Sequence, residues 1–253
     1  MFVARGKAME RPGHRRLSAA GVHGVVSSPD GPPTRLLVID DRAFDVVAGL
    51  LPDVSAGTIT VLATAPRCTE LLVGQAAWKA RTTTAMIGRD LHLVPELPLP
   101  SGLTLRSVRR CPDDPAGGVA LRDAVAVAIR ADPSEGDPAA LEGYLSALPS
   151  AMQLFAAVDG DGVVRATSGF GVFERWAHVL FVNTEPGSRR RGIGRAMTAA
   201  ALRAALAAGA QRACLDASDV ARPIYERLGF EVVDGAIQFS RVAPLTIRPT
   251  ARP

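Results

Sequence analysis

The chain has 253 residues with a formal net charge of +4, and 47% of its residues are hydrophobic. This length is sufficient for a sizeable buried core and predicts about two modest domains, while the charge excess is too small to indicate nucleic-acid binding. No apolar run approaches the roughly 20 residues of a membrane-spanning helix, so we expect neither a membrane nor a nucleic acid as partner.

The three cysteines, Cys68, Cys111 and Cys214, are an odd number without the spacing of a metal site. This pattern is typical of a reduced protein that has no disulfide framework. The basic N-terminus lacks the apolar segment of a secretion signal. We therefore expect a cytoplasmic protein without a metal, in which residues 1–20 form a flexible extension.

Residues 21–93 predict a small α/β domain, because short apolar runs alternate there with turn signals and helical periodicity. Strands are predicted at 22–26, 36–39, 58–62 and 81–88, and helices at 40–51 and 66–77. Asp40 or Asp41 is predicted to cap the first helix. The segment 94–102 follows with three prolines and one glycine, which predicts an extended linker.

Residues 103–242 predict a second, larger domain, and residues 243–253 a tail. Strands are predicted at 103–108, 153–158, 163–173, 177–182, 212–216, 230–233 and 236–242, and helices at 117–130, 138–148, 192–208 and 220–228. Such a succession of elements predicts an α/β (α+β) fold in which helices flank a mixed central sheet.

The most informative stretch of the chain runs from Arg189 to Arg195, between an apolar strand and an Ala-rich helix. Gly192 and Gly194 let a ligand approach the backbone, and the first N–H groups of the helix have no helical acceptor. The positive end of the helix dipole and the surrounding arginines suit a pyrophosphate. The candidate phosphate-binding residues are Arg189, Arg190, Arg191, Gly192, Ile193, Gly194 and Arg195.

The same residues resemble the acyl-CoA-binding motif of the GNAT superfamily of acetyltransferases, in which Arg or Gln-x-x-Gly-x-Gly or Ala follows a strand. A second block, Leu215–Ser218 followed by Ile224–Phe230, lies at the distance usual in that family. The resemblance covers about residues 103–242 and implies a GNAT-like sheet that binds acetyl-CoA as acyl donor. Residues 59–88 also resemble the second half of a GNAT module without its glycine loop; an unrelated lid or dimerisation layer is the alternative, and monomer and homodimer both stay open.

In a GNAT site the pantetheine arm lies between two splayed parallel strands, here 177–184 and 212–216. The resemblance implies that the backbone of Val182, Asn183 and Thr184 aligns this arm and polarises the thioester carbonyl. Ser218 or Asp219 stands where family members carry a CoA-contacting asparagine.

Tyr225 occupies the family's general-acid position, where a phenol with an ordinary pKa of about 10 can protonate the leaving thiolate. A purely structural tyrosine is the alternative. The general base stays open between Asp216, which ends a strand, and Glu174, His178 and Glu185, which flank the preceding strand. The acidic residues Asp132, Glu135, Asp137 and Glu142 could attract a cationic acceptor.

The resemblance thus implies an acyl-CoA-dependent N-acetyltransferase, in which a primary amine attacks the thioester directly. The alternative is a non-catalytic acyl-CoA-binding regulatory module that keeps the loop and has lost the catalytic groups.

Overall fold

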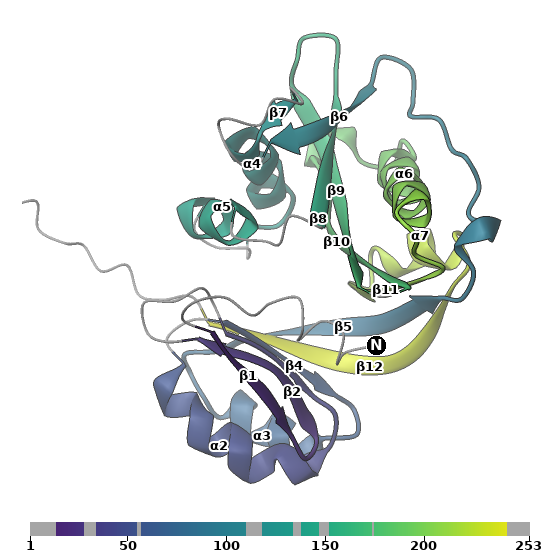
Figure 1. The fold of residues 1–253 in the computed structure, drawn as a ribbon. Helices are drawn as coiled ribbons and strands as arrows, with labels where there is room; N and C mark the ends of the chain where they lie inside the picture. Colours follow the sequence, from purple (N-terminus) through teal and green to yellow (C-terminus); the bar gives the residue numbers. More distant parts are fainter. Residues whose placement is uncertain are drawn as a thin grey trace, which may run out of the picture. The chain divides into compact units, whose positions relative to one another are not determined.

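The computed structural model describes residues 14–27, 34–54, 57–109, 118–133, 138–146, 152–173 and 175–241. The chain forms two compact units: a larger one that contains Thr82–Ala236, and a smaller one that contains Pro12–Arg81 and the residues from Ile237 onward. Figure 1 shows the elements of both units along the chain. None of the described helices is long and apolar enough to cross a bilayer.

The larger unit is built on a mixed sheet of eight strands or strand segments in the order β12-β5-β11-β10-β9-β8-β6-β7. Strands β8, β9 and β10 form an antiparallel meander, β11 is parallel to β10, and β5 is antiparallel to β11. The strands are β5 (Lys79–Gly88), β6 (Thr104–Arg109), β7 (Val119–Ala120), β8 (Met152–Val158), β9 (Val164–Phe173), β10 (Trp176–Thr184), β11 (Arg212–Ala217) and β12 (Phe230–Arg241).

Helices cover both faces of this sheet. In Figure 1, α4 (Leu121–Ala131) and α5 (Pro138–Ser146) lie on one side of the β8–β10 meander, while α6 (Ile193–Ala207) and α7 (Arg222–Glu226) lie on the other. Side chains from alternate positions of the strands supply the core on each side. The core on the α4 side includes Met152, Leu154, Val125 and Leu145, and the core on the α6 side includes Phe170, Val179, Leu215, Leu202 and Tyr225.

The proline-rich segment belongs to the larger unit. After the 3-10 turn η3 (Leu91–Leu93), residues 94–100 form neither helix nor strand, as expected for a chain with three prolines. Val94 is buried and Leu97 packs against the same core as α6. The division between the two compact units lies within β5, at Arg81 and Thr82.

The smaller unit contains β1 (His14–Ala19), β2 (Val22–Ser27), β3 (Thr34–Val38), α2 (Phe44–Leu50), β4 (Gly57–Leu62) and α3 (Pro66–Val73), with the 3-10 turns η1 (Asp41–Ala43) and η2 (Leu51–Asp53). Strands β1, β2 and β3 form an antiparallel meander, and β4 is parallel to β3. The buried core includes Val22, Leu36, Val47, Ile59, Leu72 and Trp78.

Three sequence-based boundaries need correction. Residues 14–19 form β1 and are no extension, because they pair with β2 across the turn at Gly21, where φ is +73°. Helix α3 ends at Val73, before the predicted residue 77, and the two predicted final strands are one strand, β12. Residues 1–13 and 242–253 lie outside the described part of the chain.

Candidate active site

The parallel strands β10 and β11 separate in the middle of the sheet. They pair only from Trp176 with Arg212 to His178 with Cys214, although β10 continues to Thr184 and β11 to Ala217. Beyond this point β10 stays paired with β9, and β11 stays paired with β5. The two strands therefore open a slot whose edges carry backbone groups without a partner strand.

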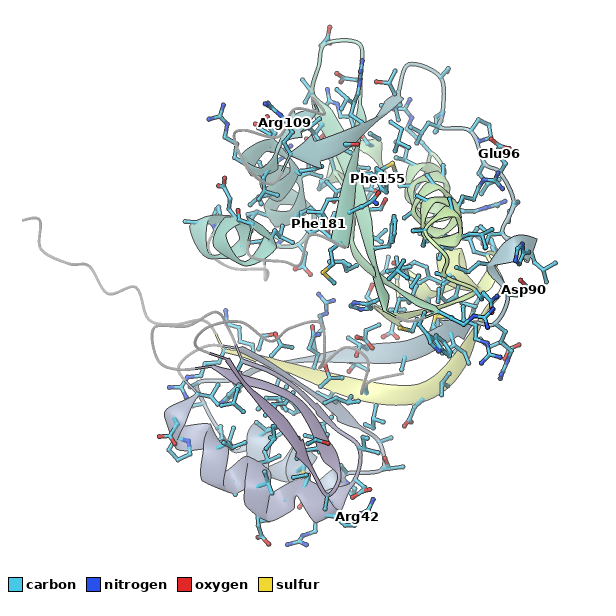
Figure 2. The ribbon with its side chains drawn as sticks, in the orientation of Figure 1. Arg42, Asp90, Glu96, Arg109, Phe155 and Phe181 are labelled. Atoms are coloured by element: carbon cyan, nitrogen blue, oxygen red, sulfur yellow. The ribbon has the colours of Figure 1, made fainter. Side chains whose placement is uncertain are left out.

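A β-bulge lies on β10 beside this slot. The register with β9 shifts between Leu180 and Asn183, and Phe181 has a φ of +57°, which is rare for a bulky residue. The hydroxyl of Thr167 donates to the Phe181 carbonyl at 2.9 Å, and Asn183 Nδ2 donates to Thr167 Oγ1 at 3.4 Å. The Phe181 ring packs with the core on the α4 side (Figure 2). These contacts hold the backbone of β10 in a strained turn at the slot.

The glycine loop ends at the start of α6 and leaves space in front of it. Gly192 is the N-cap residue with φ +78° and ψ 0°, and no side chain caps the helix. A Cβ on Gly192 would meet no atom within 4 Å, whereas a Cβ on Gly194 would lie 3.3 Å from Thr184 Oγ1. The first helical hydrogen bond runs from the Ala196 N–H to the Gly192 carbonyl, so the preceding N–H groups have no helical acceptor, a geometry that suits an anion.

The arginines of this loop differ in their surroundings. Arg190 and Arg191 are exposed, and Arg190 also has a positive φ of +63°. Arg195 is half-buried, and its Nε is a buried donor without a hydrogen-bond partner in the described part of the chain. Arg189 instead donates to the carbonyls of Thr184 and Ala131. Three of the four arginines thus keep cationic groups for a phosphate.

The candidate bases His178 and Asp216 lie on the same face of the sheet. His178 pairs with Cys214 on one side and with Gly171 on the other, and Gly171 pairs with Met152. Paired residues share a face, and so do residues two apart in a strand. Because Met152 belongs to the core on the α4 side, His178 and Asp216 lie on that face, next to the slot.

The candidate acid Tyr225 belongs to the other face. It is 5% exposed, lies on α7 and packs with Leu215 and Ala217 in the core on the α6 side. Its ring centroid is 6.0 Å from that of Phe230. Ser218 follows β11 directly, and its carbonyl accepts the N–H groups that start the turn into α7. The slot between β10 and β11 therefore separates the candidate acid from the candidate bases.

Glu185 is unsuited to the role of base. Its carboxylate accepts from Arg165 Nη1 at 2.7 Å and from Arg130 Nε at 3.1 Å, and Arg165 Nε also binds Asp159 at 2.7 Å. The hydrogen bond from Arg165 is the main cause of a lowered pKa of Glu185. Glu174, Glu135 and Asp137 lie outside the described residues, while Asp132 and Glu142 are half-buried.

A cavity of about 810 Å³ adjoins this ion-pair network and the glycine loop. Its lining mixes polar and apolar surface and contains residues from four separate segments of the larger unit. These residues are Ser101, Gly102, Leu103, Arg130, Asp159, Arg165, Glu185, Pro186, Gly187, Ser188 and Arg191. Within the described ranges, no cluster of His, Cys, Asp or Glu side chains could hold a metal ion.

Sequence reasoning missed the supporting residues of the site. The strands predicted at 153–158 and 163–173 imply a turn at Asp159, but no local pattern indicates the ion pair between Asp159 and Arg165. Thr167 gave no signal, because its contact with Phe181 depends on the bulge in the neighbouring strand.

The comparisons with known proteins concern the family and the fold. Residues 126–245 match the family model described as "Acetyltransferase (GNAT) domain". A GCN5-related N-acetyltransferase from Kribbella flavida has a similar fold, with a TM-score of 0.60 and 20% identity over 92% of this chain and 91% of that one. A GCN5-related N-acetyltransferase from Sphaerobacter thermophilus has a TM-score of 0.55 and 17% identity, over 88% and 81%.

A tandem GNAT protein from the clavulanic acid biosynthesis pathway is similar as well, with a TM-score of 0.55 and 17% identity over 93% of this chain and 85% of that protein. At these identities the likeness shows a shared fold. No curated protein sequence matches the chain.

Proposed function

Because residues 126–245 belong to the GNAT acetyltransferase family, we propose that the larger unit transfers an acetyl group from acetyl-CoA to a primary amine. The observation that carries the proposal is the slot between β10 and β11, which opens beside the uncapped start of α6. The slot would take the thioester arm of acetyl-CoA, and the start of α6 would bind its pyrophosphate. The two parts belong to one molecule, so their binding sites must be adjacent.

The donor is bound mainly by backbone groups. The first N–H groups of α6, together with Arg190, Arg191 and Arg195, neutralise the pyrophosphate. The pantetheine amides pair with β10 at Val182, Asn183 and Thr184, as an added strand would. One N–H at the bulge donates to the thioester oxygen and stabilises the charge that develops there. Ser218, at the end of β11, lies on the opposite edge of the slot.

The reaction is a direct displacement. The lone pair of the neutral amine attacks the thioester carbonyl carbon, a C–N bond forms, and the C–S bond then breaks. Tyr225 donates its phenolic proton to the departing thiolate, and a base on the other face takes the proton that the amine loses. Since Tyr225 belongs to the α6 face and His178 and Asp216 to the α4 face, the two proton transfers take place on opposite sides of the slot.

Paired substitutions identify the base. We expect either His178→Gln or Asp216→Asn to lower kcat/KM by at least about 100-fold, the effect typical of a lost general base, while the other variant changes it little. An imidazole base would also give an acidic limb in the rate profile near its ordinary pKa of about 6.5, and that limb would vanish in His178→Gln.

The function itself is tested in two steps. Acetyl-CoA at 100 times its Kd should raise the stability of the folded chain by about 2.7 kcal/mol, which a melting curve detects easily. Release of free thiol is then followed over a panel of amino acids, polyamines, amine antibiotics and peptide N-termini. A melting temperature that acetyl-CoA leaves unchanged would refute both the transferase and any acyl-CoA-binding role.

A non-catalytic acyl-CoA-binding module is the second candidate, and the burial of Tyr225 favours it. At 5% exposure the ring packs against Phe230 as a core residue does. This reading predicts the shift in melting temperature without thiol release from any amine.

We further propose that the smaller unit is a degenerate GNAT half. Its order of a β1-β2-β3 meander, α2, β4 and α3 repeats the order of β8-β9-β10, α6, β11 and α7. Similar folds that extend over about nine-tenths of this chain, the tandem GNAT protein among them, support this view.

A further inference from the structure

The guanidinium of Arg189 is bonded to the backbone of two other elements. Its Nε donates to the Thr184 carbonyl at 3.2 Å, and its Nη2 donates to the Ala131 carbonyl at 2.6 Å. Thr184 is the last residue of β10, and Ala131 is the last residue of α4. The first arginine of the phosphate loop thus connects the ends of a strand and a helix.

The contact with α4 has a plain electrostatic basis. The last carbonyls of a helix lack helical donors, and a cation is favourable at that end of the dipole. In α4 the Asp132 N–H makes the closing bond to Ala128, so the Ala131 carbonyl lies beyond the helical ladder. An arginine fork is suited to bind this carbonyl and the Thr184 carbonyl at once.

A second contact with α4 lies at the other end of the same loop, at Glu185. Glu185 follows β10 directly, accepts from Arg130 of α4, and also donates its N–H to the Arg165 carbonyl at 2.9 Å. The last two residues of α4, Arg130 and Ala131, therefore hold both flanks of the loop that runs from Glu185 to Arg189.

The strand end held in this way borders the slot. Thr184 belongs to the backbone that lines the slot edge, and a Cβ at position 194 would lie 3.3 Å from its hydroxyl. A shift of Thr184 would move the slot edge and the start of α6 together, since no side chain intervenes at Gly194.

We propose that Arg189 is a positioning residue, which aligns the thioester-binding end of β10 and is not a ligand of the CoA phosphates. This inference rests on the proposed acetyl-CoA function. Arg189 and Arg191 are both exposed on this loop, but Arg189 is bonded to two backbone carbonyls, and under the proposed function Arg191 is the phosphate ligand.

The test compares two acyl donors that carry the same thioester. Acetyl-CoA has the phosphates, and S-acetylpantetheine lacks them. Arg189→Ala should lower kcat/KM for both donors by about tenfold, the cost of a lost hydrogen bond to a charged group. Arg191→Ala should lower it for acetyl-CoA and leave S-acetylpantetheine unaffected. Arg122→Ala, an exposed change on α4, serves as the neutral control.

Arg189→Lys separates charge from shape and replaces Arg189→Ala if that variant fails to fold. A lysine keeps the charge but cannot bridge two carbonyls as a fork, so the loss with S-acetylpantetheine should persist. An effect of Arg189 variants on acetyl-CoA alone, or rescue of both donors by lysine, would overturn the proposal. If the wild-type protein released no thiol from either donor, the proposed function would fail first, and the role of Arg189 with it.

Discussion

Two of the parallel strand pairs among the described residues, β10 with β11 and β3 with β4, have the same connection through a helix and opposite outcomes. The first pair separates after three residue pairs, whereas the second stays in register over all five, from Thr34 with Gly57 to Val38 with Val61. Beyond β4, the hydroxyl of Thr64 donates to the Ile39 carbonyl, which also ties together the chain ends that leave the two strands. Of these two pairs, only β10 with β11 opens a slot between its strands.

The loops that follow β10 and β3 also differ, in whether a side chain of the chain itself accepts the free backbone N–H groups. After β10 the helix start has glycines and no side-chain cap, but after β3 the chain supplies its own carboxylates. Asp40 accepts the Arg42 N–H at 3.0 Å, and Asp41 accepts the N–H groups of Arg67 and Cys68 at the start of α3. An internal carboxylate occupies the position that an external phosphate needs, so a helix start can serve either stability or binding.

The largest expected effect comes from giving the open loop a carboxylate. Gly192→Glu should weaken acetyl-CoA binding by at least about 100-fold, because a negative side chain enters the space of the pyrophosphate and the residue must keep φ near +78°. Isothermal titration measures the change. Gly162→Glu, on a hairpin turn with φ +79° and open space around it, is the matched control and should bind as the wild type does.

The next effect concerns Tyr225, the proposed general acid of the larger unit. Residues 12–81 of the smaller unit contain no tyrosine. Tyr225→Phe keeps the ring against Phe230 and removes the hydroxyl that would protonate the thiolate, so we expect kcat to fall by about 100-fold. Steady-state thiol release gives the rate. Unchanged turnover together with an unchanged pH profile would remove Tyr225 from the mechanism.

The closed pair predicts the binding stoichiometry. We expect one acetyl-CoA per chain, because β3 and β4 stay paired and the helix starts beside them are already bonded. Titration of wild-type protein of known active concentration measures the ratio. A second equivalent that survives Gly192→Glu would show that the smaller unit also binds the donor.

A smaller effect is expected at the start of α3, where the side chain of Asp41 accepts two backbone N–H groups. Asp41→Ala removes the acceptor of two N–H groups at the start of α3 and should lower the stability by about 1 kcal/mol. Urea unfolding measures the loss. The acetyl-CoA Kd should stay at its wild-type value, and a weaker Kd would contradict the assignment of binding to the larger unit alone.

The smallest effect is the loss of stability at low pH when Glu185 becomes protonated. The pKa of Glu185 is lowered in the folded state, chiefly by the hydrogen bond from Arg165, so its ion pairs stabilise the fold above the ordinary carboxyl pKa and are lost as the pH falls below it. Denaturant unfolding at pH 7 and pH 4 should therefore show a smaller pH dependence in Glu185→Gln than in wild type. Equal dependence would mean that the unfolded chain keeps the same ion pairs.

Local pattern was sufficient to predict the parts of the site that lie close together in sequence. The spacing of Gly192 and Gly194 after an apolar run predicted the start of α6, and the period of the following alanines predicted its length to within one residue at each end. The positive φ at Phe181 was not predictable, because it arises from a register shift against another strand.

Contacts between distant segments could not be predicted either. The pairing of β5 with β11 joins residues 84–88 to residues 213–217, and no local pattern specifies which distant strand becomes a neighbour. Arg189 was predicted as a phosphate ligand from its motif, and its bond to Ala131 depends on where α4 ends in space. The prediction that residues 1–20 form an extension is wrong for His14–Ala19, because this segment gains its partner only in the folded sheet.

The pairing of β5 with β11 has a practical consequence for anyone who wishes to study the larger unit alone. A gene fragment that begins after the proline-rich segment would encode the glycine loop, both slot strands and Tyr225, and would still leave the backbone edge of Ala213–Ala217 bare. Bare edges recruit strands from other molecules, so such a fragment should aggregate instead of folding. The smallest fragment that keeps the slot in a folded sheet must therefore include β5 and begin upstream of Thr82.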